Sequence, residues 1–272
     1  MDCVRLGDIV VHYRHRPAAP SARTVVFINS LGTDFRIWDG VIEALDAELG
    51  VVVYDKRGHG LSGVGSTPYT IADHAGDLAR LLETLGIFQA IVCGLSVGGQ
   101  IAQQLYFDRP NLVAGLVLCD TAAKIGDPDF WHRRIDAISR DGIASVTDGI
   151  MERWFSAGFR QSGGPDYDIA RAMFERQPVE GYLATCAAIA DFDRRADTAS
   201  ISVPVSVLVG SEDGATPPDL VAEFARQIAG SQFQIIEGAG HLPCIETPLP
   251  VAAAIAALAE RVEQGDMRNV AS

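Results

Sequence analysis

The sequence predicts an α/β protein, with a mostly parallel central sheet flanked by helices. Short β-branched apolar runs alternate with longer helical patterns, which is typical of that fold class. The chain has 272 residues and is 48% hydrophobic, enough for a large buried core. Residues 122–198 interrupt the alternation with helical patterns and no convincing strand. We therefore expect a core formed by residues 1–121 and 199–272, with 122–198 inserted as a helical cap over the carboxyl-terminal edge of the sheet.

The expected strands follow one another as short apolar runs. An alternating stretch, residues 4–14, should form an opening strand pair. The later runs are 24–29, 50–55, 90–95, 114–120, 203–210 and 233–239. The central runs are apolar almost throughout, as strands covered on both faces of a sheet are.

Three helices outside the cap are expected. Residues 70–85 carry apolar side chains three or four positions apart, which predicts an amphipathic helix that ends at Gly86. A second helix should follow the 90–95 strand and stop before Pro110, and a third covers 250–264. Within the cap, the loop from Ser162 to Pro165 indicates a hinge.

Charge and composition argue against several classes of function. The chain has 22 Lys and Arg against 35 Asp and Glu, a net charge of −13 that disfavours nucleic acid as a partner. No run approaches the roughly 18 apolar residues of a membrane span. Five scattered cysteines, without a CxxC pair, make a disulfide framework or a zinc site improbable. The N-terminus lacks a signal-peptide stretch, so we expect a reduced, cytoplasmic protein.

A G-x-S-x-G pattern, Gly94 to Gly98, ends the 90–95 strand and precedes a helical pattern. Such glycines permit the sharp strand-to-helix turn that exposes a serine, which makes Ser96 the candidate nucleophile. A serine hydroxyl needs a base to take its proton. Of the six histidines, only His241 follows the last expected strand in a glycine-rich loop, and it is the candidate base.

The third member of such a triad is an acid that lies between serine and histidine in the chain. Asp213 follows the 203–210 strand, with Glu212 beside it and Gly214 allowing a tight turn. An acid there holds the imidazole tautomer and stabilises the imidazolium. Asp120, at the end of the preceding strand, is the rival acid.

An oxyanion needs backbone N–H donors that are already in place. One expected donor is Val97, the residue after the nucleophile, and the other lies in the loop after the 24–29 strand. By position this second donor is Leu31, with Gly32 letting the backbone approach, although an ordinary strand-to-helix loop fits the same residues.

A second glycine pattern, Gly58 to Gly63, matches the dinucleotide fingerprint G-x-G-x-x-G. That motif must open a helix, whose N-terminus holds the pyrophosphate. Here Val64 to Pro68 follows, which cannot be helical. We expect a loop ordered by His59, and no cofactor is implied.

Four segments resemble the α/β-hydrolase superfamily: NSLGTDFRIWD (29–39), YDKRGHGLS (54–62), CGLSVGG (93–99) and GAGHLPCIETP (238–248). From the first strand to the final helix, the chain is similar to 3-oxoadipate enol-lactonases of the β-ketoadipate pathway. The NSLGTD loop and the TAAKIG segment (121–126) carry this closer resemblance. It implies hydrolysis of a small, carboxylated enol-lactone to 3-oxoadipate through an acyl-enzyme, without a metal or cofactor.

Such a substrate keeps a free carboxylate, which an arginine can bind with two hydrogen bonds. The cap supplies Arg133 and Arg134 near Trp131, and Arg153 next to Trp154. The resemblance favours Arg134 and Trp131. Most arginines on a cap helix are solvated, however, and Trp154 fits the cap interior as well as a pocket wall.

Other functions remain open on the same machinery. A carboxylesterase, or a C–C hydrolase of aromatic ring-cleavage products, uses the same triad, because the fold does not set the substrate. A non-catalytic ligand-binding homologue is disfavoured, because serine, acid and histidine are all present in the required order. The sequence leaves open the lactone regiochemistry, the extent of cap motion and the oligomeric state, a homo-oligomer included.

Overall fold

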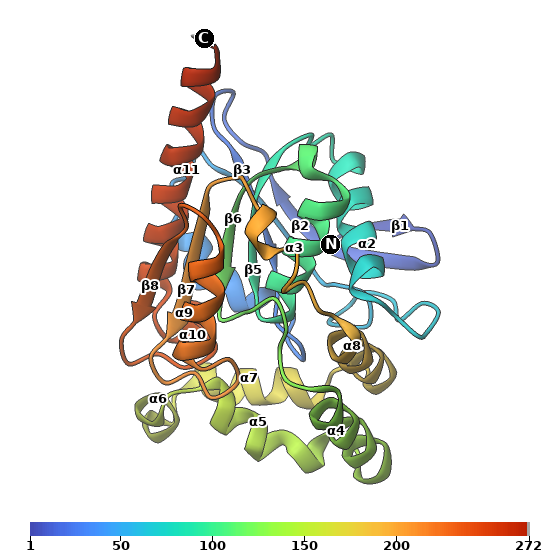
Figure 1. Cartoon of the computed structure of the whole chain (residues 1–272). Helices are drawn as coiled ribbons and strands as arrows, with labels where there is room; N and C mark the ends of the chain where they lie inside the picture. The colour runs from blue at the N-terminus through green and yellow to red at the C-terminus, as the bar shows by residue number, and fades with distance from the viewer. Residues whose placement is uncertain (271–272) are drawn as a thin grey trace.

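The computed structural model describes the backbone of residues 1–270 and the side chains of residues 1–265 (Figure 1). One eight-stranded sheet has the order β1-β2-β4-β3-β5-β6-β7-β8. β1 pairs antiparallel with β2, and β2 with β4, whereas all other neighbours are parallel. The strands are β1 (Asp2–Leu6), β2 (Ile9–Arg16), β3 (Thr24–Ile28), β4 (Gly50–Tyr54), β5 (Ala90–Leu95), β6 (Val113–Cys119), β7 (Val205–Gly210) and β8 (Gln232–Ile236). This sheet confirms the predicted fold class.

The centre of the sheet is buried, as the apolar runs predicted. Every residue of β4, β5, β6 and β7 is buried. β8 is the outer edge strand, and only Ile236 among its residues is buried. The last strand was expected to reach residue 239, but it ends at Ile236, because Gly238 takes a φ of 73° and turns the chain into the loop that carries His241.

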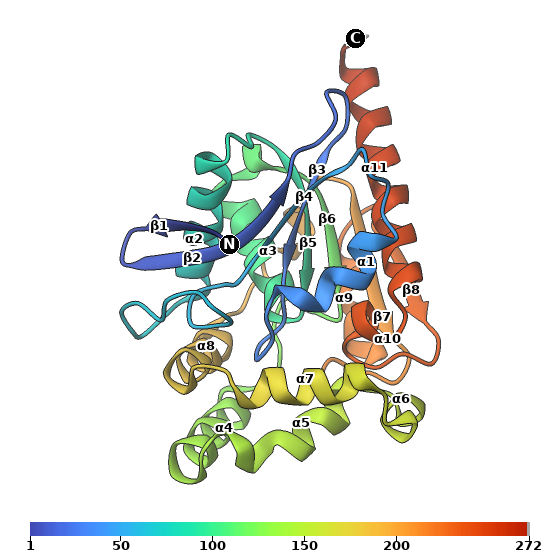
Figure 2. The same cartoon turned by 180° about the vertical axis from the view of Figure 1, so that it is seen from behind.

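Helices cover both faces of the sheet. α1 (Asp39–Glu43) and α11 (Pro248–Val270) lie together on one face (Figure 2), and α2 (Ile71–Thr84), α3 (Val97–Asp108) and α9 (Pro218–Gln227) lie on the other. α10 (Pro243–Glu246) precedes α11. The three expected helices correspond to α2, α3 and α11, whereas α1 and α9 had not been predicted. The five residues of α1 are too few to show a helical period.

The interrupting segment forms five α-helices, with no strand between residues 122 and 198. We call this segment the cap. Its helices are α4 (Pro128–Asp141), α5 (Thr147–Trp154), α6 (Ala157–Ser162), α7 (Pro165–Glu175) and α8 (Val179–Asp191). They lie across the carboxyl ends of the parallel strands, at the bottom of Figures 1 and 2. The 162–165 loop is the turn between α6 and α7, with Gly163 left-handed at φ 57°; its role as a hinge stays a prediction.

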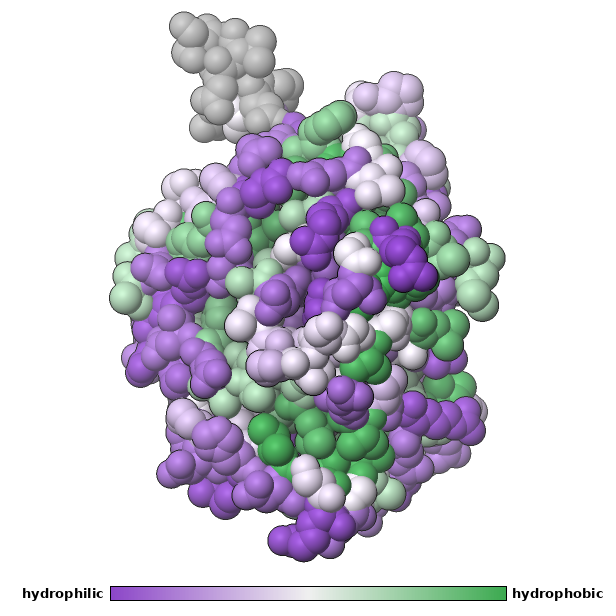
Figure 3. Space-filling view, turned by 90° about the vertical axis from the view of Figure 1, so that its right-hand side faces the viewer, coloured by the Kyte–Doolittle hydropathy of each residue, from purple (hydrophilic) through white to green (hydrophobic). Residues whose placement is uncertain are grey.

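The surface is mixed in character. Figure 3 shows hydrophilic side chains over much of one side of the molecule and a hydrophobic patch at the level of the cap. Among the described residues, no helix is both long enough and apolar enough to cross a membrane. All five cysteines are free thiols, and only Cys3 is exposed.

Candidate active site

Ser96 occupies the turn between β5 and α3 in a conformation that non-glycine residues rarely adopt, with φ 59° and ψ −119°. A side chain at Gly94 would overlap the carbonyl of Gly98, and one at Gly98 would overlap the carbonyl of Ile28. The Ser96 N–H donates to Cys119 O (2.9 Å), and Thr121 Oγ1 donates to Ser96 O (2.7 Å). These contacts hold the sharp turn that the G-x-S-x-G pattern predicts.

His241 and Asp213 form a buried pair. His241 Nδ1 lies 2.9 Å from Asp213 Oδ2, and the same carboxylate accepts the N–H groups of Ala215 (2.7 Å) and Thr216 (2.9 Å) and the hydroxyl of Thr216 (2.6 Å). Burial raises the pKa of Asp213, but His241 and the bonds from Thr216 outweigh it and lower that pKa below its usual value. The carboxylate therefore stays ionised and orients the imidazole through Nδ1, so that Nε2 is left for a reacting hydroxyl.

Asp120, the rival acid, lies nearby but does not hold the histidine. One of its carboxyl oxygens lies within 4.8 Å of both Asp213 and His241, and Oδ1 accepts the Gly210 N–H (2.9 Å). Burial, and next the charge of Asp213, raises the pKa of Asp120 well above its usual value, which favours the protonated form of this carboxyl. Glu212 is also engaged elsewhere, since its Oε2 accepts the Ala157 N–H (2.9 Å).

The raised pKa of Asp120 leads to a prediction about how the stability of the fold depends on pH. A carboxyl whose folded-state pKa is raised keeps a proton that the unfolded chain releases, so stability is lost as pH rises above about 4. Asp120→Asn keeps the acceptor for Gly210 and cannot ionise. We expect its stability relative to wild type to rise with pH between 4 and 8, by up to about 1.4 kcal/mol per pH unit. Thermal unfolding across this range measures the difference, and a difference independent of pH would contradict a neutral Asp120.

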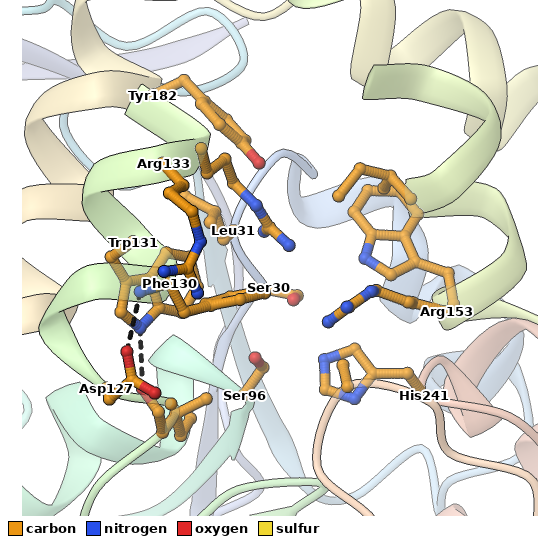
Figure 4. Close-up of a pocket in the computed structure, with 16 residues that line it drawn as sticks. Ser30, Leu31, Ser96, Asp127, Phe130, Trp131, Arg133, Arg153, Tyr182 and His241 are labelled. Carbon is orange, nitrogen blue, oxygen red and sulfur yellow. Dashed lines mark hydrogen bonds between the residues drawn. The ribbon is translucent and has the colours of Figure 1, made fainter. Parts of the chain in front are cut away.

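Core and cap together enclose a cavity of about 310 Å³ in front of Ser96 and His241 (Figure 4). From the core, Ser30 and Leu31 also line it. The cap contributes all four predicted substrate-binding residues, which are Trp131, Arg133, Arg134 and Trp154. Arg153 also lines the cavity from the cap. Asp213 and Val97 are not lining residues: Asp213 is hydrogen-bonded to two residues of the wall, His241 and Ala215, and Val97 is buried as the first residue of α3.

The two proposed oxyanion donors are free to bind a ligand. Among the described residues, neither the N–H of Leu31 nor that of Val97 donates to another group of the protein. Gly32 has φ 76°, and a side chain there would press against the ring of Phe174. The glycine therefore permits the close approach of this loop to the cap, a contact that the sequence did not predict.

Three arginines converge on the cavity without an acidic partner. The guanidinium carbon of Arg134 lies 4.8 Å from the ring centre of Phe130 and 4.9 Å from that of Trp131, and Arg153 lies 5.0 Å from Phe130. Within residues 1–265, no carboxylate lies within 4.0 Å of these two or of Arg133. The cavity therefore carries a local positive charge in a chain whose net charge is −13.

The two tryptophans form apolar walls. Trp131 is fixed by its indole N–H, which donates to Ile125 O (2.7 Å). Trp154 packs edge-on against Phe174, with 5.6 Å between ring centres, and also lines the cavity, so it belongs to the cap interior and the wall together. Sequence reasoning missed Phe130, Tyr182 and Thr216; only Thr216 left a local signal, a hydroxyl three residues after the acid.

The end of α5 is fastened to both loops of the His241–Asp213 pair. The Gly214 N–H donates to Arg153 O (3.3 Å), and the Leu242 N–H donates to Trp154 O (3.2 Å). Glu246 accepts the Gly240 N–H (2.8 Å) through Oε1 and the Ser156 hydroxyl (2.6 Å) through Oε2. This end of the cap is therefore part of the same hydrogen-bonded unit as the histidine.

The segment that matches the dinucleotide fingerprint, residues 58–63, does not lead directly into a helix. Residues 58–63 lie in turns, and the next helix begins at Ile71. His59 is fully buried. Its ring Nδ1 lies 3.2 Å from Arg57 O, and its backbone N–H donates to Lys56 O. The loop prediction is confirmed, and His59 is one of the groups that order it.

The fold and a serine at its strand-to-helix turn define an α/β hydrolase. The chain belongs to the alpha/beta hydrolase family, whose sequence model matches residues 25–254. It is 35% identical to 3-oxoadipate enol-lactonase 1 of Acinetobacter baylyi over 229 residues, which cover 84% of this chain and 85% of that protein. It also resembles the crystal structure of the enol-lactonase from Burkholderia xenovorans LB400, with a TM-score of 0.89 and 32% identity over 94% of this chain and 99% of that one. A thermophilic esterase from Thermogutta terrifontis, solved with malate bound, is similar with a TM-score of 0.89 and 28% identity over 96% and 99% of the two chains.

Proposed function

We propose that this hydrolase opens a small enol-lactone that carries a free carboxylate, yielding 3-oxoadipate from 3-oxoadipate enol-lactone. The observation that carries the proposal is the set of unpaired arginines that share one cavity with Ser96 and His241. A carboxylate in that cavity would be held by charge-assisted hydrogen bonds from Arg134 or Arg153. The similarity to two enol-lactonases supports the choice of substrate.

In this mechanism His241 takes the proton of Ser96 as Oγ attacks the lactone carbonyl. The N–H groups of Leu31 and Val97 hold the tetrahedral oxyanion. Collapse breaks the ring C–O bond, and the departing enolate oxygen takes the proton from His241. The enolate is a better leaving group than an alkoxide because its negative charge is delocalised, and the resulting enol then tautomerises to the ketone. His241 then deprotonates a water molecule that attacks the acyl-enzyme, and Ser96 regains the proton as the acid departs.

The decisive experiment compares two substrates with the purified protein. The loss of 3-oxoadipate enol-lactone and the hydrolysis of neutral p-nitrophenyl acetate are followed spectrophotometrically, with Ser96→Ala as the background. The proposal requires Ser96-dependent lactone opening with a kcat/KM well above that for the ester. Ester hydrolysis without lactone opening would favour a carboxylesterase, the second candidate, which the likeness to the Thermogutta terrifontis esterase supports.

The arginines give a prediction about selectivity. Arg134→Met removes the guanidinium that lies over Phe130 and Trp131 but keeps an apolar side chain at this position, so we expect kcat/KM for the lactone to fall about 10- to 100-fold, mainly through KM. The neutral ester should change less than about threefold. Arg140→Met is the matched control, because Arg140 lies on the same helix, pairs with Asp141 and is absent from the cavity wall. Equal losses for lactone and ester would speak against carboxylate binding by Arg134.

A further inference from the structure

Lys56 is a fully buried lysine that the mechanism above does not use. Its side chain is 1% exposed, and within residues 1–265 no carboxylate lies within 4.0 Å of its ammonium nitrogen. Among the same residues, its Nζ makes one hydrogen bond, to Ser30 O at 2.6 Å. Burying an amine without an ion-pair partner is costly, so this placement needs a reason.

The acceptor of that bond belongs to the peptide unit that carries the Leu31 N–H. Ser30 C=O and Leu31 N–H are the two ends of one planar trans peptide and point in opposite directions. Lys56 therefore lies behind the peptide, while the N–H end belongs to Leu31, which lines the cavity with Ser30 (Figure 4). A donor at the oxygen of an amide polarises that amide and strengthens the N–H as a donor in turn.

We propose that Lys56 is a positioning residue that strengthens oxyanion binding, by polarising the Ser30–Leu31 peptide from behind. Lys56 does not touch the substrate and acts through the Leu31 N–H alone. The inference rests on the proposed function, because it needs Leu31 to be an oxyanion donor. It assigns a role to Lys56 of the YDKRGHG segment, which neither binds the substrate nor belongs to the triad.

The charge state of the amine is not critical to this role. Burial lowers the pKa of Lys56 well below its usual value, and the negative charges of Asp55 and Asp34 act in the opposite direction. A neutral amine also donates an N–H to Ser30 O, and an ammonium adds a positive charge behind the oxyanion. Both forms polarise the peptide in the same sense.

A second donor to the same carbonyl provides a matched control. Thr33 Oγ1 donates to Ser30 O at 2.9 Å, with weaker contacts at 3.4 Å from Asn29 Nδ2 and from the Thr33 N–H. If Lys56 merely held the loop in place, Lys56→Met and Thr33→Val would remove equivalent supports. Polarisation instead makes the shorter bond from the amine the more important of the two.

The experiment measures hydrolysis of p-nitrophenyl acetate and inhibition by phenylboronic acid, whose serine adduct is a tetrahedral anion. For Lys56→Met we expect kcat to fall about tenfold or more with KM within about twofold, because an oxyanion forms only in the transition state. The boronic acid Ki should rise by a similar factor. Thr33→Val should lower kcat less than about threefold, and Lys56→Gln, which restores an N–H donor, should retain more activity than Lys56→Met.

Each outcome bears on a different statement. Two results would overturn the role of Lys56 while hydrolysis by Ser96 stands. One is an equal loss of kcat in Lys56→Met and Thr33→Val, and the other is a Ki that does not rise as kcat falls. An absence of Ser96-dependent hydrolysis in wild type would overturn the proposed function and this inference together. Methionine is one atom shorter than lysine but fills most of the same volume, and Ser30 O keeps its hydrogen bond from Thr33 Oγ1, so we expect Lys56→Met to fold. If thermal unfolding nevertheless shows a disrupted Lys56→Met, the comparison of Lys56→Gln with Thr33→Val decides, since glutamine must then lower kcat and raise Ki relative to wild type.

Discussion

Ser96→Ala is expected to lower kcat for lactone and ester by about a millionfold, the loss that follows removal of a nucleophile that acts as a unit with its base. Ser30 also lines the cavity, but it lies in the loop after β3 and not at the G-x-S-x-G turn that Ser96 occupies. Steady-state assays with enzyme in large excess over contaminants measure the residual rate. Activity above about one part in a thousand of wild type would contradict Ser96 as the nucleophile.

The stability of this variant should stay close to that of wild type. The Ser96 hydroxyl makes no hydrogen bond to another described residue, and the turn is held by the Ser96 backbone through Cys119 and Thr121. Thermal unfolding is therefore the control: an unchanged Tm assigns the lost rate to chemistry. Alanine keeps the strained φ of 59°, so the strain is common to both proteins.

Asp213→Asn is expected to lower kcat about 10⁴-fold. The asparagine oxygen keeps the N–H bonds from Ala215 and Thr216, so its amide nitrogen must face His241 Nδ1 and donate to it. That reverses the tautomer and leaves Nε2 protonated, which prevents it from acting as a base. The pH profile of kcat in wild type and variant measures the loss.

Two neighbouring acids supply controls for this prediction. Glu212→Gln keeps an acceptor for the Ala157 N–H and should change kcat less than about threefold. Asp120→Asn removes the other carboxyl near His241 and should also retain most of the activity. If Asp213→Asn lowers kcat less than tenfold, and adding Asp120→Asn abolishes the remaining activity, Asp120 replaces the missing acid.

The features that the sequence predicted are those that depend on a local pattern of residues. The apolar runs and the glycines around Ser96 fix the sheet and the turn, because each depends on neighbours within a few residues. Asp213 and His241 could be selected from the order of strands and the glycines beside them, although Asp120 stayed open as a rival acid. Thr216 was also within reach, since a hydroxyl three residues after an aspartate is a common turn partner.

Other parts of the site depend on contacts between distant segments. Lys56 lies in a polar run, and its burial results from the approach of Ser30, 26 residues earlier in the chain. Phe130 and Tyr182 line the cavity from two cap helices whose mutual packing no spacing rule gives. The sequence likewise offered three cap arginines without indicating that all of them lack an acidic partner.

The hydrogen bonds at the end of α5 have a consequence for how this enzyme acquires new substrates. Arg153 and Trp154 shape the cavity, yet their carbonyls also hold the N–H groups of Gly214 and Leu242. An insertion or deletion at this point would displace the histidine together with the wall. We therefore expect changes of side chain to be tolerated there, and changes of chain length to be tolerated only away from this junction, as at the turn at Gly142. Diversification of substrate range should therefore proceed by substitution on α4 and α8, with the length of the α5–α6 junction held constant.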